Sequence, residues 1–383
     1  MKISMLGTLP PLKGISYYCW NLSRALAPKV ELEFFTFRTL YPEFLYPGGT
    51  KASGLEKVLE RENRFSAFST LSIYNPLSWI KTAFRISGDV VHAHLWSMPV
   101  VPVWILIFAL LKRRHKKIVI TIHNVLPHES SRFDKMMTKI VLRFADRFIV
   151  HAERNIDDLD SIFHISRDRV SRVPMGPHYT YQPGKIYDTA EAKKELGIDI
   201  GAKVLLQFGN IREYKGVDDF IRALALVKQS YRGKVIGLIV GQPWKSFEKY
   251  EKLITQLGLS ENIKTYLSYI PDTEVSKYFY ASDIAVLAYK EMKGQSAVGH
   301  IAVDMGLPMV VTNTGGLPDL VFDKNFVVEP ERPDLLAEKI TEILQDDRVA
   351  EKLKKDTAEI QKANSWDRIS DMTVELYKTM VSV

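Results

Sequence analysis

Short runs of β-branched and other apolar residues alternate along this chain with longer segments in which apolar residues recur every three or four positions. The short runs predict buried strands and the longer segments predict amphipathic helices, and their alternation is typical of parallel α/β sheets. In the first half, helices are expected over residues 15–26 and 133–145. The expected strands of this half are residues 2–6, 30–37, 90–94, 118–122 and 148–151. Residues 38–70 have no clear period and are rich in proline, glycine and aromatic residues, so they predict a long loop or a small insertion.

The alternation stops near residue 173 and resumes after residue 190, and the prolines and glycines between these points indicate a linker at 177–190. The strands expected after the linker are 204–208, 235–240, 284–287 and 309–312. The helices expected with them are 217–228, 245–257, 273–281, 333–345 and 365–380. The predicted fold class is therefore α/β, with two doubly wound, Rossmann-like parallel-sheet domains, 1–176 and 191–365, that face each other across a cleft.

Composition narrows the class of protein. With 383 residues, 46% hydrophobic and 25% charged, the chain can bury two cores, which excludes disordered, collagen-like and disulfide-scaffold proteins. The single cysteine, Cys19, cannot pair within the chain, and the first residues do not resemble a signal peptide, so a cytoplasmic protein is expected. Residues 1–190 carry a net charge of +10 and the remaining residues −3, which together give the net charge of +7. This asymmetry favours a phosphate-bearing substrate or an anionic membrane as partner; nucleic acid is not expected, because no basic patch is interleaved with aromatic residues.

Residues 95–111 are almost wholly apolar. A membrane-spanning helix needs about 20 such residues, and Pro99 and Pro102 interrupt the start of this run, so it predicts a buried helix. A basic cluster follows it directly: Lys112, Arg113, Arg114, Lys116 and Lys117. This cluster could contact anionic headgroups, which would make the protein peripheral at the inner membrane face or mark the acceptor side of a site.

The residues just after each strand carry the chemistry, because ligands of open parallel sheets bind beyond the carboxyl ends of the strands. Gly14 ends the loop GTLPPLKG after the first strand, where backbone amides could approach a phosphate, although a simple turn glycine is an equal alternative. His123 follows strand 118–122 and could offer a hydrogen bond to a substrate, the alternative being a structural histidine. His92 and His94 end a neighbouring strand, but no acidic residue has the spacing of a metal ligand, so no metal is expected.

Two stretches of the second half predict an anion site. In FGNIREYKG, Gly209 and Asn210 precede two cations, Arg212 and Lys215, at the start of a helix, where positive side chains and free amides together attract a diphosphate. The second stretch is GQSAVGHIAVDMGLPMVVTNTGGLPD. It opens a helix with the turn Gln295, Ser296, Ala297 and Val298, and it ends on Gly315 and Gly316, which permit close backbone approach.

These stretches, together with GTLPPLKG, VVHAH, TIH, ADRFIVH and VPMG, resemble in order and spacing the GT-B glycosyltransferases of family 4 type over nearly the whole chain. The resemblance implies that Arg212 and Lys215 bind the donor diphosphate and that His123 lies near the transferred sugar. It implies that Gly14 and the 294–298 turn approach the donor. It also implies that the first domain faces the acceptor and that the last helix, 366–383, packs back on that domain.

The chain departs from the family at one pair of positions. The usual two glutamates would fall at 293 and 301, where this chain has Lys293 and Ile301. It resembles a subset of the family with a Gln-Ser turn, in which Gln295 and Ser296 would bind the sugar or the phosphate. The implied function is transfer of a hexosyl group from a UDP- or GDP-sugar to a hydroxyl acceptor, lipid-linked or a growing glycan, with retention and without an obligatory metal. Two alternatives stay open: a sugar-nucleotide epimerase of related fold, and a non-catalytic binding subunit.

Overall fold

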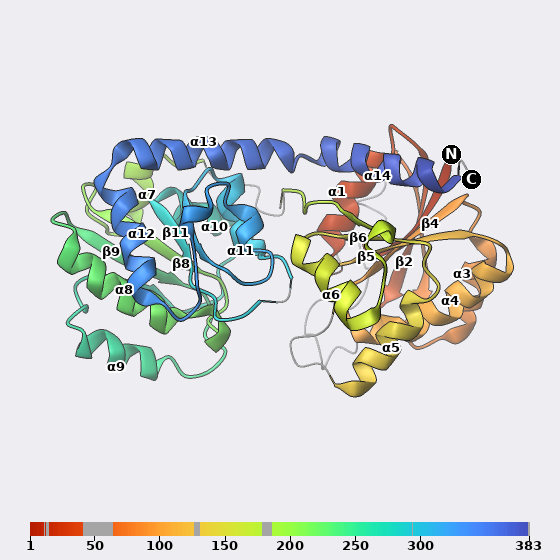
Figure 1. The fold of residues 1–383 in the computed structure, drawn as a ribbon, viewed down its shortest axis with the longest axis horizontal. Helices are drawn as coiled ribbons and strands as arrows, with labels where there is room; N and C mark the ends of the chain where they lie inside the picture. Colours follow the sequence, from red (N-terminus) through yellow and green to blue (C-terminus); the bar gives the residue numbers. More distant parts are fainter. Residues whose placement is uncertain are drawn as a thin grey trace. The chain divides into compact units, whose positions relative to one another are not determined.

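The computed structural model describes residues 1–10, 12, 15–40, 64–125, 131–177, 186–292 and 294–381. The chain forms two compact units (Figure 1). Unit 1 consists of residues 1–176 and 364–383, and unit 2 consists of residues 177–363. Each unit is a parallel sheet with helices packed against it, so the predicted fold class, two doubly wound α/β units, is confirmed.

Unit 1 has a seven-stranded sheet in the order β3-β2-β1-β4-β5-β6-β7, and every neighbouring pair is parallel. Its strands are β1 (Lys2–Gly7), β2 (Glu31–Thr39), β3 (Ser66–Ser72), β4 (Val90–Leu95), β5 (Lys117–Ile122), β6 (Arg147–Val150) and β7 (Val170–Arg172). One face packs against α1 (Ser16–Leu26) and α14 (Trp366–Val381). The other face packs against α3 (Pro76–Arg85), α4 (Val101–Arg113), α5 (Arg132–Leu142) and α6 (Glu153–Phe163).

Unit 2 has a six-stranded parallel sheet in the order β10-β9-β8-β11-β12-β13. Its strands are β8 (Lys203–Phe208), β9 (Val235–Val240), β10 (Ile263–Tyr266), β11 (Ile284–Leu287), β12 (Met309–Thr312) and β13 (Val327–Val328). Its helices are α7 (Thr189–Glu195), α8 (Val217–Ser230), α9 (Glu248–Gln256), α10 (Asp272–Tyr280), α11 (Ala297–Asp304), α12 (Pro333–Gln345) and α13 (Asp347–Ala363). The apolar residues of these strands and helices form one core, which fixes the strand ends that carry the candidate site.

The last helix, α14, belongs to unit 1, although it follows unit 2 in the sequence. It contacts α1 and places Tyr377 and Ile369 in the core beside the sheet. An ion-pair cluster at its start reinforces the contact, because the Lys29 ammonium lies 2.7 Å from both Asp367 and Asp371.

Two sequence expectations changed in unit 1. Residues 38–70 were expected to lack regular structure, but β2 extends to Thr39 and β3 begins at Ser66, while residues 41–63 lie outside the described part. Strand β3 escaped prediction because it is a half-exposed edge strand rich in serine and threonine. The apolar run 95–111 does contain a buried helix, but α4 begins only at Val101, after a short 3-10 turn (Met98–Val100) with Pro99. Among the described residues, no helix is long and apolar enough to cross a membrane.

Candidate functional site

A pocket of about 470 Å³ lies in unit 2 beyond the carboxyl ends of β8, β9 and β10. Three loops form most of it, one after each of these strands, and α10 and α11 complete it. The lining residues are Phe208, Gly209, Asn210, Arg212, Tyr214, Lys215, Gly241, Gln242, Tyr269, Ile270, Val275 and Val298. The pocket therefore has the position at which an open parallel sheet binds its ligand.

Both predicted cations line this pocket. The Lys215 side chain is 8% exposed and lies over the Tyr289 ring, with its ammonium 5.3 Å from the ring centre. The Arg212 guanidinium stacks on the ring of Trp244 at 4.0 Å. Burial lowers the pKa of Lys215, and the nearby positive charge of Arg212 adds to this effect.

Neither cation has an acidic partner in the described part of the chain, unlike the lysines around them. Lys249 lies 2.9 Å from the Glu213 carboxylate, and Lys290 lies 2.7 Å from Asp218. Burying a charge without a counter-charge costs free energy, so it is uncommon unless a ligand supplies the opposite charge. The chemistry of this pocket therefore suits an anionic ligand.

Glycines allow the loops to approach one another closely. Gly209 has φ +94°, and a Cβ there would lie 2.7 Å from the Lys215 ammonium and 3.0 Å from Val298. Gly216, at φ +62°, starts α8, and any side chain would collide with the carbonyl of Ala288. The chain therefore needs glycine at both positions to hold Lys215 against the pocket.

The predicted 294–298 turn begins α11 beside the loop that carries Arg212 and Lys215, which we call the cation loop. Val298 of this turn lines the pocket itself. Ser296 is buried and caps the helix, because its hydroxyl accepts a hydrogen bond from Gly299 N at 3.2 Å. The Tyr289 hydroxyl lies 3.3 Å from the same oxygen. The side-chain oxygen of Gln295 pairs with a ring nitrogen of His300 at 3.2 Å. The polar groups of both residues are therefore already engaged within the unit.

Gly315 and Gly316 form a second turn that packs on the first. Gly316 N donates to the carbonyl of Gly294 at 2.9 Å, and a Cβ at Gly316 would meet the Gln295 side chain. Gly316 therefore packs on the 294–298 turn, an added Cβ at Gly315 would meet Met292, and Ala297 is exposed at the start of α11.

The carboxyl edge of the unit 1 sheet carries four buried histidines. His92 and His94 lie on β4, and His123 and His151 directly follow β5 and β6. Both ring nitrogens of His123 are engaged: Nε2 lies 3.2 Å from His94 Nδ1, and Nδ1 lies 3.2 Å from His151 Nε2. Burial lowers the pKa of His92 to about 3 and that of His151 to about 4, and it holds those of His94 and His123 well below the usual value. Among the described residues, no three histidine, cysteine or acidic side chains are placed to hold a metal ion.

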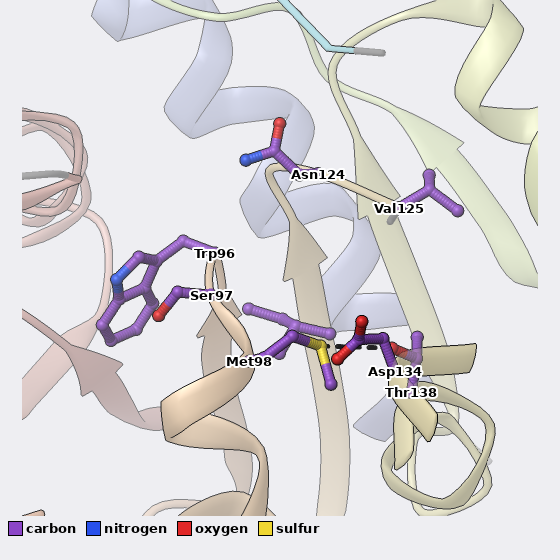
Figure 2. Close-up of a pocket in the computed structure, with 8 residues that line it drawn as sticks. Trp96, Ser97, Met98, Asn124, Val125, Asp134 and Thr138 are labelled. Atoms are coloured by element: carbon purple, nitrogen blue, oxygen red, sulfur yellow. Dashed lines mark hydrogen bonds between the residues drawn. The ribbon is translucent and has the colours of Figure 1, made fainter. Parts of the chain in front are cut away.

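A second pocket, of about 500 Å³, lies in unit 1 between the ends of β4 and β5 and helix α5 (Figure 2). Trp96, Ser97 and Met98 come from the segment after β4, and Asn124 and Val125 come from the segment after β5. Asp134 and Thr138 point into the pocket from α5, where the Thr138 hydroxyl lies 3.8 Å from the Met98 sulfur. Apolar and polar side chains line this pocket in equal number, which suits a partly apolar ligand.

Comparison with known proteins supplies the family. The model described as Glycosyl transferases group 1 matches residues 188–360, and that described as Glycosyltransferase Family 4 matches residues 12–177. Together they leave unmatched only the two ends and a short stretch near the unit boundary. The chain belongs to the GT-B glycosyltransferases of this type. The resemblance seen in the sequence and the expected enzyme class are both confirmed.

Individual relatives of this glycosyltransferase are distant. It is 25% identical to a D-inositol 3-phosphate glycosyltransferase of Corynebacterium aurimucosum over 97% of this chain and 92% of that protein. It is 29% identical to the protein of that name in Corynebacterium efficiens over 61% of this chain, but spans only 56% of that relative's length. Among solved structures, Anabaena HepE in complex with UDP has a TM-score of 0.72 at 17% identity, with both chains covered fully. A glycosyltransferase of Rickettsia africae has the same TM-score at 18% identity, covering 99% of this chain and 98% of that one.

The structure of the glycosyltransferase brings some predicted site residues together and separates others. Gly209, Asn210, Arg212, Lys215 and Val298 line one pocket in unit 2, and the remaining turn residues adjoin it. His123 lies in unit 1, within the histidine cluster, and Gly14 lies outside the described residues. The sequence analysis did not select Trp244 or Tyr269 as site residues. Trp244 follows the end of a predicted strand and Tyr269 follows the end of a strand that was not predicted, and this position after a strand end could have indicated them.

The basic cluster at the end of α4 makes more contacts within unit 1 than expected. The Lys112 ammonium pairs with Asp146 at 2.7 Å. Arg114 donates to the carbonyls of Ala83 and Ile86, and Lys116 donates to those of Ser87 and Gly88. Arg113 and Lys117 are exposed. Three of the five side chains therefore tie α4 to the end of α3 and to β6, which leaves them less available to a membrane.

Proposed function

We propose that this glycosyltransferase binds the diphosphate of a nucleotide sugar at Arg212 and Lys215 and moves its hexosyl group to a hydroxyl acceptor. The bond from the anomeric carbon to the diphosphate oxygen breaks, and a bond to the acceptor oxygen forms. The acceptor proton leaves with the nucleoside diphosphate. The two cations that lack acidic partners carry the proposal, because they can neutralise the negative charge that develops on the leaving diphosphate.

The donor is proposed to be a UDP-sugar, with a GDP-sugar as the alternative. Anabaena HepE, which shares the fold over the whole chain, has been solved with UDP and with UDP-glucose. We further propose that transfer proceeds with retention and without an obligatory metal, as the family resemblance implies. Analysis of the products tests this proposal against an epimerase, whose product keeps its nucleotide, and against a binding subunit, which releases no nucleoside diphosphate.

The decisive experiment combines Arg212→Ala with Lys215→Ala. Removing one such charge-stabilising group commonly lowers turnover by about 10²–10³-fold, so the double variant should lose at least about 1,000-fold in kcat/KM while keeping its melting temperature. Thermal-shift titration with UDP-, GDP- and ADP-sugars should show stabilisation of the native protein that the double variant has lost. Lys249→Ala, which removes a neighbouring lysine that is paired with Glu213, is the matched control. Undiminished turnover in the double variant would contradict the assignment.

For the acceptor, we propose a lipid-linked or otherwise partly apolar molecule that the enzyme meets at an anionic membrane surface. Helix α4 contacts both α3 and α5 in unit 1. The outer sides of α3 and α5 expose large apolar side chains: Leu77 and Phe84 are each 65% exposed, Phe133 is 62% exposed and Met136 is 51% exposed. Large apolar side chains exposed at a protein surface commonly mark a contact site.

On α5, basic residues accompany the exposed apolar side chains. Lys135 and Lys139 of α5 are exposed, as are Arg132 and Arg143 at its two ends, and none forms an ion pair with a described residue. The three helices contain a single acidic residue, Asp134, whose carboxylate accepts a hydrogen bond from Ser131 N in the capping box of α5. Apolar side chains flanked by unpaired cations fit an anionic lipid surface. Asp134 and Thr138 on the inner side of α5 also line the unit 1 pocket, where the apolar part of the acceptor would enter.

Co-sedimentation with vesicles that contain anionic lipid tests this surface. Lys135→Glu with Lys139→Glu should reduce the bound fraction several-fold at low salt, because each basic residue contributes about 1 kcal/mol near such a surface. Lys354→Glu with Lys355→Glu on α13 is the matched control and should have no effect. Equal binding by both double variants, or no binding by the unchanged enzyme, would rule out α5 as the membrane contact.

A further inference from the structure

An aromatic ring, and not a carboxylate, holds Arg212 at the unit 2 pocket. The Arg212 guanidinium lies 4.0 Å from the centre of the Trp244 ring. The described residues give this guanidinium no ion-pair partner and no hydrogen-bond acceptor. The adjacent Glu213 faces other cations, since its carboxylate lies 2.9 Å from the Lys249 ammonium and 3.9 Å from that of Lys245. Among the described residues, the Trp244 ring is therefore the group that the positive charge of Arg212 contacts.

The backbone fixes Trp244 beside Arg212, because the loops after β8 and β9 are bonded to each other. Ile211 N donates to the carbonyl of Gln242 at 2.9 Å, and Trp244 N donates to the carbonyl of Ile211 at 3.0 Å. Ile211 also pairs with Pro243 in a parallel β-bridge. The pairing of β8 with β9 therefore continues past the strand ends and brings the indole next to the guanidinium.

An aromatic ring can order an arginine without using the groups that the arginine offers to an anion. A guanidinium stacked on a ring uses its face, so the N–H donors at its edge stay available. The ring attracts the cation through its quadrupole and carries no net charge, so the positive charge is not neutralised. A carboxylate in the same place would neutralise that charge and occupy the donors in a bidentate pair. The Trp244 ring thus restricts the Arg212 side chain without competing with an anion.

The second cation of the pocket has the same kind of support. The Lys215 ammonium lies 5.3 Å from the centre of the Tyr289 ring. The neighbouring Lys290, which does not line the pocket, lies instead 2.7 Å from the Asp218 carboxylate. The two supporting rings differ in burial, because Tyr289 is in the core and Trp244 is 67% exposed. Trp244 can therefore be substituted without disturbing the core of unit 2, which makes it the ring to test.

We propose that Trp244 is a positioning residue whose ring orders the Arg212 guanidinium, with its N–H edge free for two oxygens of a phosphate group. Trp244 acts through Arg212 and does not contact the anion itself, in keeping with a pocket lining that includes Arg212 but not Trp244. An arginine ordered before binding loses less rotamer freedom when the anion arrives, which raises affinity. The inference rests on the proposed function for the identity of the anion, a nucleoside diphosphate.

Side-chain NMR of the unliganded protein tests the ordering of Arg212 without any ligand. Protons held over an indole ring resonate upfield, so the δ and ε protons of Arg212 should be shifted upfield, and Arg212→Ala assigns them by their loss. Trp244→Phe should keep a shift in the same direction, and Trp244→Leu should abolish it. Phe68→Leu is the matched control, because it removes the ring over which the Arg85 guanidinium lies at 3.8 Å in unit 1. Unshifted Arg212 signals in the unchanged protein would overturn the proposal.

Calorimetric titration with inorganic pyrophosphate and with UDP tests the consequence for binding. Trp244→Leu should weaken both ligands about fivefold, the loss expected for an exposed cation–π contact, and Trp244→Phe should recover most of this affinity. In the Arg212→Ala background, Trp244→Leu should cause no further loss, because the ring acts through the arginine. Phe68→Leu should leave both affinities unchanged. The melting temperature should not change in Trp244→Leu, since the side chain is 67% exposed.

Each negative result contradicts a different statement. If Arg212→Ala weakens pyrophosphate binding and Trp244→Leu does not, the positioning role is wrong and the proposed function stands. A loss in Trp244→Leu for UDP alone would show that the indole contacts the nucleoside directly. Equal losses with and without Arg212 would show that the ring does not act through that residue, and either result overturns the inference. Unchanged pyrophosphate affinity in Arg212→Ala would contradict the proposed function and the inference together.

Discussion

The carboxyl edge of the unit 2 sheet holds two cations that have no acidic partner among the described residues, whereas the same edge of the unit 1 sheet holds four histidines that are buried and uncharged. In unit 2, Arg212 and Lys215 line a pocket and pack on the rings of Trp244 and Tyr289. In unit 1, every ring nitrogen of His92, His123 and His151 has a partner within the protein. The same sheet topology thus supports one edge with positively charged side chains and one edge with neutral rings that are hydrogen-bonded within the protein.

The two edges differ in the free-energy cost that their polar groups impose on the unliganded protein. A buried lysine without a counter-charge destabilises the unliganded fold, and a bound diphosphate would relieve that cost. A neutral, fully bonded histidine chain has little such cost and fixes ring orientation instead. The costly arrangement, a buried positive charge, is therefore found in the unit 2 pocket, and the arrangement with little cost is found at the edge of the unit 1 sheet.

The largest expected effect comes from the glycine at the end of the central strand in each sheet. Gly209→Ala places a methyl group 2.7 Å from the Lys215 ammonium at φ +94°, so Lys215 must move, and donor affinity should fall about 100-fold. Gly7→Ala in unit 1 places it 3.0 Å from Cys19 and 3.2 Å from His94. This tighter packing should lower the free energy of unfolding by about 1–3 kcal/mol and leave donor affinity nearly unchanged.

Donor titration and thermal melts of both variants make the measurement. Gly258→Ala is the control for backbone strain alone, because Gly258 has φ +63° and nothing within 4 Å of an added Cβ. If Gly258→Ala and Gly209→Ala weaken donor binding equally, the displacement of Lys215 is not the cause.

The next effect is a pH dependence that only the unit 2 edge should show. Burial lowers the pKa of Lys215 below the ordinary value of 10.5, so the residue loses its charge at a lower pH than a solvent-exposed lysine. Burial favours the uncharged amine. Rising pH therefore reduces the desolvation cost of Lys215 in the unliganded protein, but it also removes the positive charge that would hold the donor. Donor affinity should therefore fall about tenfold on the alkaline side, and it should do so below pH 10.5.

Lys215→Arg separates this effect from general alkaline instability, because a guanidinium stays charged across that range. The variant should bind the donor with little alkaline decline, as measured by calorimetric titration from pH 7 upward. An identical decline in both proteins would show that some other group titrates.

Much of this comparison was accessible from the sequence, because apolar runs mark buried strands reliably. The strand at Val235–Val240 was predicted residue for residue, and the loop with Arg212 and Lys215 was placed correctly after β8. The sequence analysis missed the short strands β7, β10 and β13. They have three, four and two residues, several of them partly exposed, and so short a run gives no clear hydrophobic pattern. Sequence spacing thus locates a strand end well when the strand is central and poorly when it is at the edge.

Contacts between distant segments account for the rest. Trp244 reaches Arg212 from the loop after β9, and no spacing rule links the two positions. The sequence put His92, His94 and His123 at neighbouring strand ends, but no sequence pattern shows that the His123 ring lies between those of His94 and His151. The sequence also could not show that Lys112 pairs with Asp146, whereas Lys135 has no ion pair with a described residue. The residue type alone does not indicate whether a lysine lies next to a carboxylate in the fold.

The smallest expected effect concerns Ser296, which the family resemblance assigns to the donor. Its hydroxyl already caps α11 and meets the Tyr289 hydroxyl, so Ser296→Ala should cost about 1 kcal/mol of stability, the usual value of a helix N-cap. If capping is its whole function, donor affinity should change less than twofold, and Ser296→Asp, which can cap equally well, should restore the melting temperature while its negative charge weakens donor binding. A tenfold loss of donor affinity in Ser296→Ala at unchanged stability would instead indicate that Ser296 contacts the donor. The donor-binding residues would then extend from the cation loop to the start of α11.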